Sequence, residues 1–388
     1  MGDAGRGVVA MTQPECIKKG MYWDRAWSLV RGCTKVSEGC LHCWSERESS
    51  MRSVHPNEKI KAQYDRLTNV FGRFNGKIRL MENNLELPLR VKKPTTWAAW
   101  NDLFHEDVPD EFILATFVAM GLTYKNTGEM EEISPGHKVA IHEPRHTFII
   151  LTKRPERMKN LVKRLVSGEP DKVWEEKAHF FAAGLATKNG SPLPGNAIFT
   201  FGKWVKDGMR GLWLGVTAEN QEQADKRIPI LLQIPATVRF VSVEPMLGPI
   251  VLRRKAVNDN EIVQAALMGR LDEYSRPIER GIDWIICGGE SGPGARPIHP
   301  DWARSLRDQC QAAGVPFFFK QWGEWRQVGL CGTEPDDRRY YNKSNVQIVN
   351  HEGGQGYHGK GAIYMQRVGK KKAGRILDSR TWDEFPEV

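Results

Sequence analysis

The chain has 388 residues, 40% of them hydrophobic, and a formal net charge of +9 at pH 7. This length excludes a minimal domain and allows one α/β barrel with insertions around a sizeable core. The basic balance fits a polyanionic partner, and it equally fits charge that serves only solubility. No apolar run is long enough for a signal peptide or a membrane-spanning helix, so we expect a cytoplasmic protein without membrane contact.

Short apolar runs alternate with helical patterns along the chain, which predicts a parallel sheet built from βα units. The predicted strands are 27–31, 95–99, 146–152, 212–217, 238–243, 282–287 and 316–323. The predicted helices are 43–52, 110–120, 157–165 and 301–313. The expected fold class is therefore α/β, a partial parallel (β/α) barrel of six or seven strands with helices outside and loop insertions.

The other stretches set the expected domain organisation. A polar N-terminal segment, 1–22, precedes a barrel that spans 23–330. Loop insertions into the barrel are expected at 121–145, 167–211 and 253–280. The last part, 331–388, is polar, Gly-rich and basic, and we expect it to pack on the barrel.

Three cysteines stand within eleven residues with the spacing C-x6-C-x2-C, at Cys33, Cys40 and Cys43. Thiolates are soft ligands for zinc, copper(I) and iron–sulfur clusters, so the triple predicts a metal site. A structural zinc needs a fourth protein ligand, such as His42 or Cys16, whereas a cluster held by three cysteines leaves one iron open. Because a predicted strand leads into this loop, the cysteines are expected at the carboxyl edge of the barrel, where active sites lie.

Polar side chains follow the predicted strands. Three apolar runs each end at an acid, at Glu219, Glu244 and Glu290. Since the carboxyl ends of parallel strands meet at one edge of a sheet, these acids are expected to ring the mouth of the barrel. Lys153 and Arg154 follow the third strand, where they could hold a carboxylate or a phosphate.

Asp102 follows the second predicted strand, and two interpretations of it stay open. It belongs to the polar constellation at the mouth of the barrel, or else Asp102 or Asp107 caps the helix that begins at residue 110.

The stretches Gly32–Cys43 and Asp102–Pro109 resemble the phage-associated three-cysteine-motif family, whose members are regarded as relatives of radical S-adenosylmethionine (SAM) enzymes. The similarity runs from about Trp23 to Pro386. Radical SAM enzymes usually have the spacing C-x3-C-x2-C, and this chain keeps the second gap and lengthens the first. The resemblance implies a [4Fe-4S] cluster on Cys33, Cys40 and Cys43 that binds SAM and cleaves it reductively to a 5′-deoxyadenosyl radical.

The resemblance also implies residues for the SAM amino group. The triplet Gly288-Gly289-Glu290 is similar to the Gly-Gly-Glu motif with which radical enzymes hold that group, but it follows the sixth predicted strand instead of the second. After the second strand the chain has Asn101 and Asp102, and we assign the amino group to them.

Other strand ends would supply the rest of the SAM site. Thr217 and Glu219 are the candidates for the ribose. Lys153 and Arg154 are the candidates for the methionine carboxylate or a substrate anion. The remaining residues of the expected cofactor-binding set are Thr152, Glu244, Gly288, Gly289 and Glu290.

The expected function is that of a radical SAM enzyme, isomerase or transferase-like, that modifies a nucleic-acid base. The resemblance points to hypermodified thymidine in phage DNA, within the host bacterial cytoplasm, with flavodoxin or ferredoxin as reductant. The residues offered in support are Lys153, Arg154, the lysines 370–372, Trp97, Trp100, Trp322 and Trp325. Base–aromatic stacking contributes roughly 1–3 kcal/mol per base.

Three alternatives to this function stay open. The first is a zinc-stabilised nucleic-acid-binding module without catalysis. The second is a radical enzyme that acts on a peptide or a small metabolite, and the third is a barrel that only scaffolds a partner protein.

Overall fold

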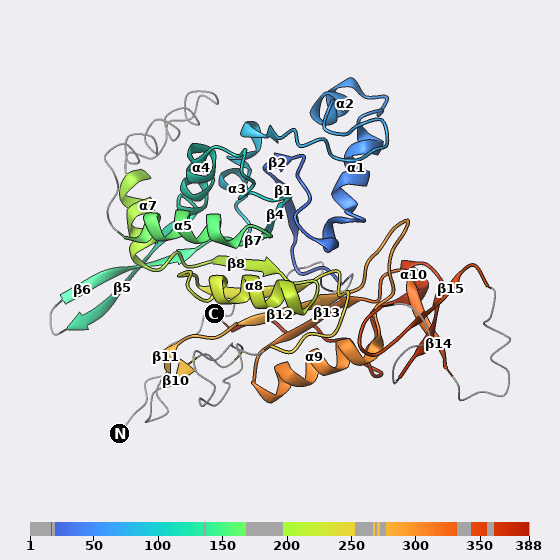
Figure 1. Cartoon of the computed structure of the whole chain (residues 1–388). Coiled ribbons are helices and arrows are strands. Elements are labelled where there is room, and N and C mark those ends of the chain that lie inside the picture. The colour runs from blue at the N-terminus through green and yellow to red at the C-terminus, as the bar shows by residue number, and fades with distance from the viewer. Residues whose placement is uncertain are drawn as a thin grey trace.

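The computed structural model describes residues 17, 20–134, 137–167, 197–252, 267, 270–271, 277–331, 343–354 and 361–387. Its centre is a seven-stranded parallel sheet, curled into a half barrel, with the strand order β1-β4-β7-β8-β9-β12-β13 (Figure 1). The expected α/β class and the partial parallel barrel are thereby confirmed.

The strands of this sheet follow the predicted runs closely. They are β1 (Arg25–Ser28), β4 (Thr96–Trp100), β7 (Thr147–Thr152), β8 (Leu212–Thr217), β9 (Val238–Val243), β12 (Trp284–Gly288) and β13 (Phe317–Gln321). The first prediction was wrong in one respect, because 27–31 is not one strand. β1 ends at Ser28, and Val30–Arg31 forms β2, which pairs antiparallel with β3 (Arg79–Leu80).

Most helices of the described part lie in the connections between the strands. The helices are α1 (Trp44–Arg52), α2 (Glu58–Tyr64), α3 (Leu87–Arg90), α4 (Asp110–Gly121), α5 (Pro155–Val166), α7 (Ala197–Lys206), α8 (Gln221–Leu231), α9 (Pro300–Ala312) and α10 (Lys370–Ala373). Two short 3₁₀ turns are η2 (Glu38–Cys40) and η3 (Glu82–Asn84). Side chains of α4, α5, α8 and α9 form the main hydrophobic core with alternate residues of the strands.

The opposite face of the sheet carries a second, mostly aromatic core. Ile149 points to this face while its neighbours Phe148 and Ile150 belong to the main core, as the two-residue period of a strand requires. Gly215 of β8 makes room for the Phe240 ring, because a Cβ there would lie 2.4 Å from the ring. The other members of the second core are Tyr22, Trp213, Val238, Trp284, Ile286 and Phe318.

Two tryptophans expected as stacking surfaces belong to the core instead. Trp97 is 2% exposed and Trp325 is 3% exposed, so neither can stack on a base, and that part of the prediction was wrong. Large aromatic side chains near strand ends are buried here because both faces of the sheet are covered.

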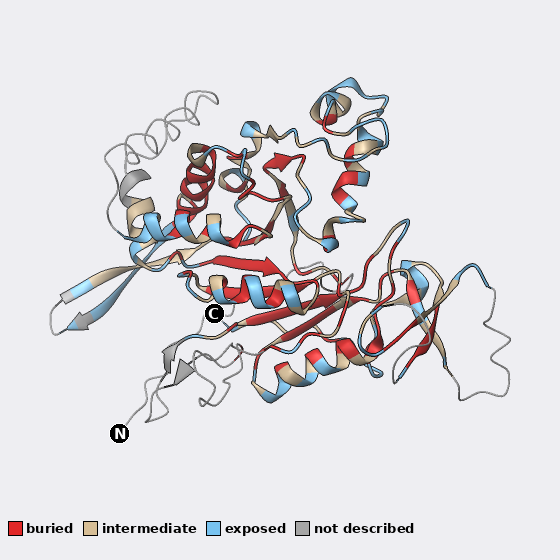
Figure 2. Ribbon diagram, in the orientation of Figure 1, coloured by how far each residue is buried: buried red, intermediate tan, exposed pale blue. Residues whose placement is uncertain are grey.

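The expected loop insertion at 121–145 is a β-hairpin formed by β5 (Tyr124–Ser134) and β6 (His137–Pro144), which projects from the sheet (Figure 1). Most of its described side chains are exposed, so it lacks the apolar alternation that predicts a strand (Figure 2). For the insertion expected at 167–211, residues 168–196 lie outside the described part, and α7 follows them. For 253–280, most residues are also outside it, and β10 (Arg270–Leu271) pairs with β11 (Pro277–Glu279).

The C-terminal part forms a small antiparallel sheet, with the order β14-β16-β15. Its strands are β14 (Trp325–Leu330), β15 (Val346–Val349) and β16 (Ile363–Arg367). Tryptophan hydrogen bonds join this part to the half barrel, since Trp325 Nε1 donates to the Ala295 carbonyl at 2.7 Å and Trp302 Nε1 donates to the His351 carbonyl at 2.7 Å.

Candidate functional site

The three cysteines lie between β2 and α1 on residues 33–43, which we call the cysteine segment. All three are free and half-buried. Gly32, with φ at +84°, turns the chain into this segment, because a Cβ there would lie 2.0 Å from the Lys77 carbonyl oxygen. Cys43 ends the segment as the N-cap of α1. The predicted ligands therefore share one short connection.

Two thiols of the cysteine segment, Cys33 and Cys43, have pKa values raised above the usual range. Burial raises the pKa of Cys33 to about 12, with Asp102 and Cys43 adding to the rise and Arg154 opposing it. Burial also raises the pKa of Cys43, and Lys153 opposes that rise. A metal that binds these thiols must displace their protons, and the two nearby cations favour the thiolate forms.

Arg154, at the carboxyl end of β7, ties the cysteine segment to the sheet. Its guanidinium donates to Asp102 Oδ2 at 2.9 Å, to both Glu106 carboxylate oxygens at 2.8 Å and to Thr34 Oγ1 at 2.6 Å. It also lies 3.8 Å from Cys33 Sγ. Burial by itself lowers the pKa of Arg154, but Asp102 and Cys33 raise it above the usual range. The candidate anion-binding group is thus a fixed, ionised anchor for the cysteine segment.

Asp102, at the carboxyl end of β4, is the partner that holds Arg154 in place. It is buried, and its carboxylate accepts hydrogen bonds from Thr152 Oγ1 at 2.6 Å and from the Lys153 amide at 3.1 Å. The Phe104 amide donates to the same carboxylate at 3.1 Å. The structure therefore brings three predicted site residues, Asp102, Thr152 and Lys153, into one cluster beside Cys33.

Asn101 joins β4 to the start of α1. Its backbone has φ at +62°, its Nδ2 donates to the Val30 carbonyl at 2.7 Å, and its Oδ1 accepts from Ser45 Oγ. The alternative that Asp102 or Asp107 caps the next helix is wrong, because Pro109 is the N-cap of α4 and no side chain caps it.

Glu219, at the carboxyl end of β8, holds the middle of the cysteine segment. It is fully buried, and it accepts from Ser37 Oγ at 2.5 Å and from Arg227 Nη1 at 2.9 Å. Lys153 Nζ lies 3.4 Å from Oε1, the oxygen that accepts from Ser37. Burial opposes ionisation, but Lys153, Arg227 and Ser37 keep the pKa of Glu219 below its usual value. A Cβ on Gly39 would lie 2.3 Å from Glu219 Cγ. The cysteine segment therefore comes so close to Glu219 that only glycine fits at this position.

Glu290, which follows β12, reaches the cysteine segment through Arg296. The Arg296 guanidinium donates to both Glu290 carboxylate oxygens, at 2.8 and 2.9 Å, and to the Glu38 carbonyl at 3.1 Å. His42 packs against Gly294, where a Cβ would lie 2.6 Å from the imidazole ring. The cysteine segment is thus held by residues from the ends of β4, β7, β8 and β12, at one edge of the sheet.

Glu244, at the end of β9, belongs to a neighbouring cluster. It accepts from Ser242 Oγ at 3.1 Å and from Tyr22 Oη at 3.4 Å, and it pairs with Lys320 Nζ at 3.0 Å. Burial and the nearby Glu244 carboxylate raise the pKa of Tyr22 well above its usual value. A Cβ on Gly288 would lie 2.9 Å from Glu244 Oε1, so this glycine accommodates the acid.

Two more predicted residues have mainly structural surroundings. Thr217 is buried at the end of β8, and its carbonyl accepts from Arg227 Nη1 at 2.7 Å. Gly289 passes so close to the backbone at Trp322 that a Cβ would lie 2.2 Å from that carbonyl oxygen. The predicted site residues thus lie along one edge of the sheet, but most of their side chains form hydrogen bonds or ion pairs with neighbouring protein groups.

Sequence reasoning missed most groups that pair with the predicted acids, among them Ser37, Arg227 and Arg296. Arg227 had a signal, because the buried residues of α8 are Ala224, Arg227, Ile228 and Leu231, with helical spacing. A basic residue on the apolar face of a helix that follows an acid-terminated strand indicates a buried ion pair. Ser37 and Arg296 are in loops and had no comparable pattern.

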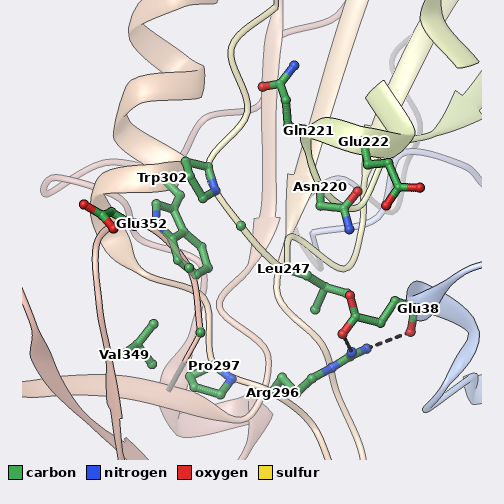
Figure 3. A pocket seen from close by; sticks show the side chains of 14 residues that line it. Glu38, Asn220, Gln221, Glu222, Leu247, Arg296, Pro297, Trp302, Val349 and Glu352 are labelled. Atoms are coloured by element: carbon green, nitrogen blue, oxygen red, sulfur yellow. Dashed lines mark hydrogen bonds and ion pairs between the residues drawn. The ribbon is translucent and has the colours of Figure 1, made fainter. Parts of the chain in front are cut away.

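A cavity of about 530 Å³ adjoins the cysteine segment (Figure 3). Glu38 of the segment and its ion-pair partner Arg296, 3.4 Å apart between nitrogen and oxygen, both line the cavity. Trp302, Glu352 and Asn220 line it as well. The cavity is therefore placed where a bound molecule would touch residues that contact the cysteine segment.

Two observations concern the whole of the described part. Among these residues, no group of three or more His, Cys, Asp or Glu side chains has the arrangement of a metal-ion site. Every helix in the same part is too short or too polar to cross a membrane.

The fold and the site define a class of protein, an α/β protein with a parallel half barrel and a three-cysteine segment bound at its carboxyl edge. Residues 18–128 and 124–386 match the model of the family described as "Protein of unknown function (DUF5131)", and the chain belongs to this family. No curated protein and no solved structure matches the chain.

Proposed function

We propose that the chain is a radical SAM enzyme that uses a [4Fe-4S] cluster on Cys33, Cys40 and Cys43. The observation that carries this proposal is the attachment of the cysteine segment to the carboxyl ends of four parallel strands by buried, charged side chains. Active sites of parallel α/β folds lie at this edge. The observation favours an enzyme over a module in which the cysteines only stabilise a loop.

The donor set suits an iron–sulfur cluster by its chemistry, although the described side chains do not have the arrangement of a metal-ion site and the thiols would have to come together to bind one. Three half-buried free thiols on one segment are the ligands that such a cluster takes, and they leave one iron without a protein ligand. Arg154 and Lys153 place positive charge near the thiols, which offsets the charge of the thiolates. When bound, the cluster would supply the electron that cleaves SAM to a 5′-deoxyadenosyl radical.

The chain's own residues would then bind and orient SAM and the substrate, and they would exclude water from the site. Asn101 and Asp102 remain the proposed partners of the SAM amino group because they stand at the end of β4, and SAM would have to replace the hydrogen bonds that they make with Val30, Ser45 and Arg154. Arg154 and Glu219 would act as positioning residues, because the first contacts Cys33 and Thr34 and the second contacts Ser37. The cavity beside Glu38 is the proposed place for the substrate.

We further propose a nucleic-acid base as the substrate. The net charge of +9 supports this, as does the partly exposed pair Trp100 and Trp44, whose rings pack edge-on at 4.8 Å between centroids near the end of β4. Lys153 and Arg154 give no support, because they are paired with Glu219, Asp102 and Glu106.

Reconstitution without oxygen tests the proposed cluster. The purified chain should become brown and bind about four irons and four sulfides. With SAM and dithionite it should release 5′-deoxyadenosine. Cys33→Ala, Cys40→Ala and Cys43→Ala should each lose the colour, whereas Cys331→Ala, at a half-buried cysteine outside the segment, should keep it. Stoichiometric zinc without iron would contradict the proposal and favour the zinc-stabilised module.

A further inference from the structure

Helix α1, which begins directly after Cys43, has its apolar residues on the outside. Its buried residues are Ser45, Glu46 and Ser49, whereas Trp44 is 50% exposed and Met51 is 58% exposed. A surface helix of a globular protein normally buries its apolar stripe and exposes its polar one. The inversion leaves Met51 and half of the Trp44 side chain exposed, although the Trp44 ring also packs edge-on against Trp100 at 4.8 Å between centroids.

The turn formed by residues 69–73 also exposes apolar side chains. The Asn69 amide donates to the Arg73 carbonyl at 2.7 Å, and the Arg73 guanidinium donates to the Leu41 carbonyl and to Glu46, each at 2.9 Å. The turn is thereby fixed to the cysteine segment and to α1, while Val70 and Phe71 at its tip are 94% and 84% exposed.

Exposed apolar side chains are concentrated here. Of the twelve exposed large hydrophobic residues in the described part of the chain, seven fall between residues 36 and 71. We call this set the α1 face, and its members are Val36, Leu41, Trp44, Met51, Val54, Val70 and Phe71. A concentration of exposed apolar side chains on one stretch of a chain is typical of an interaction site.

The stretch of chain that carries the α1 face is basic. Residues 31–79 contain ten lysines and arginines against five acids, a net charge of +5 out of +9 for the chain. One of the five acids, Glu46, is buried and paired with Lys35 at 3.3 Å and Arg73 at 2.9 Å. Arg47 and Arg52, on α1 itself, are exposed. The partner should therefore combine negative charge with apolar surface.

We infer that the α1 face is the docking surface for a small acidic electron-carrier protein. Five of its seven apolar side chains are aliphatic, which suits a protein interface, whereas nucleic-acid bases stack on aromatic rings. The surface adjoins Cys43, so a docked carrier stands next to the cysteine segment. The inference rests on the proposed function. In the proposed reaction, the carrier gives up one electron for each SAM that is cleaved reductively.

Binding to a bacterial flavodoxin, titrated calorimetrically at low and high salt, tests this surface. We expect the unsubstituted chain to bind more weakly at high salt. The variant M51D/F71D should weaken binding at least tenfold, because it places two carboxylates opposite an acidic partner. The matched control is M130D/I376D, at residues that are 56% and 62% exposed elsewhere. The control should bind like the unsubstituted chain, and both variants should keep its circular dichroism spectrum.

Several outcomes would overturn the inference. The first is that the unsubstituted chain does not bind flavodoxin. The second is that both double variants weaken flavodoxin binding equally. The third is that a single-stranded oligonucleotide binds the α1 face and displaces the flavodoxin. The last outcome would assign the α1 face to nucleic acid.

The assay also separates this inference from the proposed function. With dithionite, M51D/F71D should form 5′-deoxyadenosine at the unsubstituted rate, and with reduced flavodoxin it should be slower. If dithionite gives no 5′-deoxyadenosine from the unsubstituted chain, the proposed function fails whatever the binding data show. If dithionite works and both variants accept electrons from flavodoxin equally, only the docking surface is wrong.

Discussion

Glu219 shows how a single residue supports the site. Its carboxylate is fully buried between two cations and also accepts a hydrogen bond from Ser37 of the cysteine segment. A buried charge is tolerated only when it is paired and hydrogen-bonded. Glu219 therefore determines both the local stability and the position of the cysteines.

The substitution Glu219→Gln tests this role. It leaves Lys153 and Arg227 without their shared counter-charge, so we expect the free energy of unfolding to fall by about 3–5 kcal/mol. Urea denaturation measures the change. The control Glu222→Gln removes an acid from an exposed pair with Lys226 and should cost about 0–1 kcal/mol. Equal losses in the two variants would mean that Glu219 is not a buried ion-pair partner.

At the level of a single element, the N-terminus of helix α9 is capped by one neutral histidine. His299 is its N-cap and accepts a hydrogen bond from the Asp301 amide through Nδ1, while Nε2 donates to the Gly361 carbonyl at 2.9 Å. Burial lowers the pKa of His299, and His351 and Arg304 lower it further, against an opposing effect of Gly361 and Asp301. Protonation would place a hydrogen on Nδ1, where the cap needs a lone pair.

Stability should therefore depend on pH in a defined direction. The pKa of His299 is lower in the folded than in the unfolded chain, where it is about 6.5, so the unfolded chain binds more protons below that pH. The contribution to stability is complete above about pH 6.5 and is lost as the pH falls through the lower pKa of the folded chain. Urea denaturation at pH 7.5 and 5.5 measures it. His299→Asn keeps a good N-cap and removes the titrating ring, so it should reduce the difference between the two pH values. An unchanged difference would assign the effect to other groups, such as His146, whose pKa burial also lowers.

At the scale of the whole molecule, the net charge of +9 leads to a prediction about DNA. If the chain contacts DNA phosphates, its affinity for single-stranded DNA should fall steeply as the salt concentration rises. Lys371→Ala and Lys372→Ala, at exposed residues of α10, should each reduce the slope of log K against log salt by about 1. Fluorescence anisotropy at several salt concentrations measures this slope.

The control pair for the DNA experiment is Lys125→Ala and Lys138→Ala, at exposed residues of the β5–β6 hairpin. These variants should bind like the unsubstituted chain. Absence of binding at low salt, together with unchanged nucleosides in DNA from cells that express the protein, would remove nucleic acid as the substrate class.

The sequence by itself determined where the strands of the parallel sheet lie and which polar residues follow their carboxyl ends. The runs 212–217 and 238–243 coincide with β8 and β9, because a buried parallel strand is a continuous apolar run that needs no distant information. The acids Glu219, Glu244 and Glu290 were predicted at the strand ends for the same local reason. The hairpin at Tyr124–Pro144 escaped prediction because most of its side chains are exposed, which leaves no periodic signal.

Only the tertiary structure decided what each polar residue contacts. Glu219 and Ser37 are separated by 182 positions in sequence, and Arg296 and Glu38 by 258, so no local pattern links them. These contacts form because parallel strands bring their carboxyl ends to one edge, where buried charges must find partners in whatever segment crosses that edge. The cysteine segment crosses it here. That placement, rather than the cysteine spacing alone, is what turns residues 33–43 into a candidate active site.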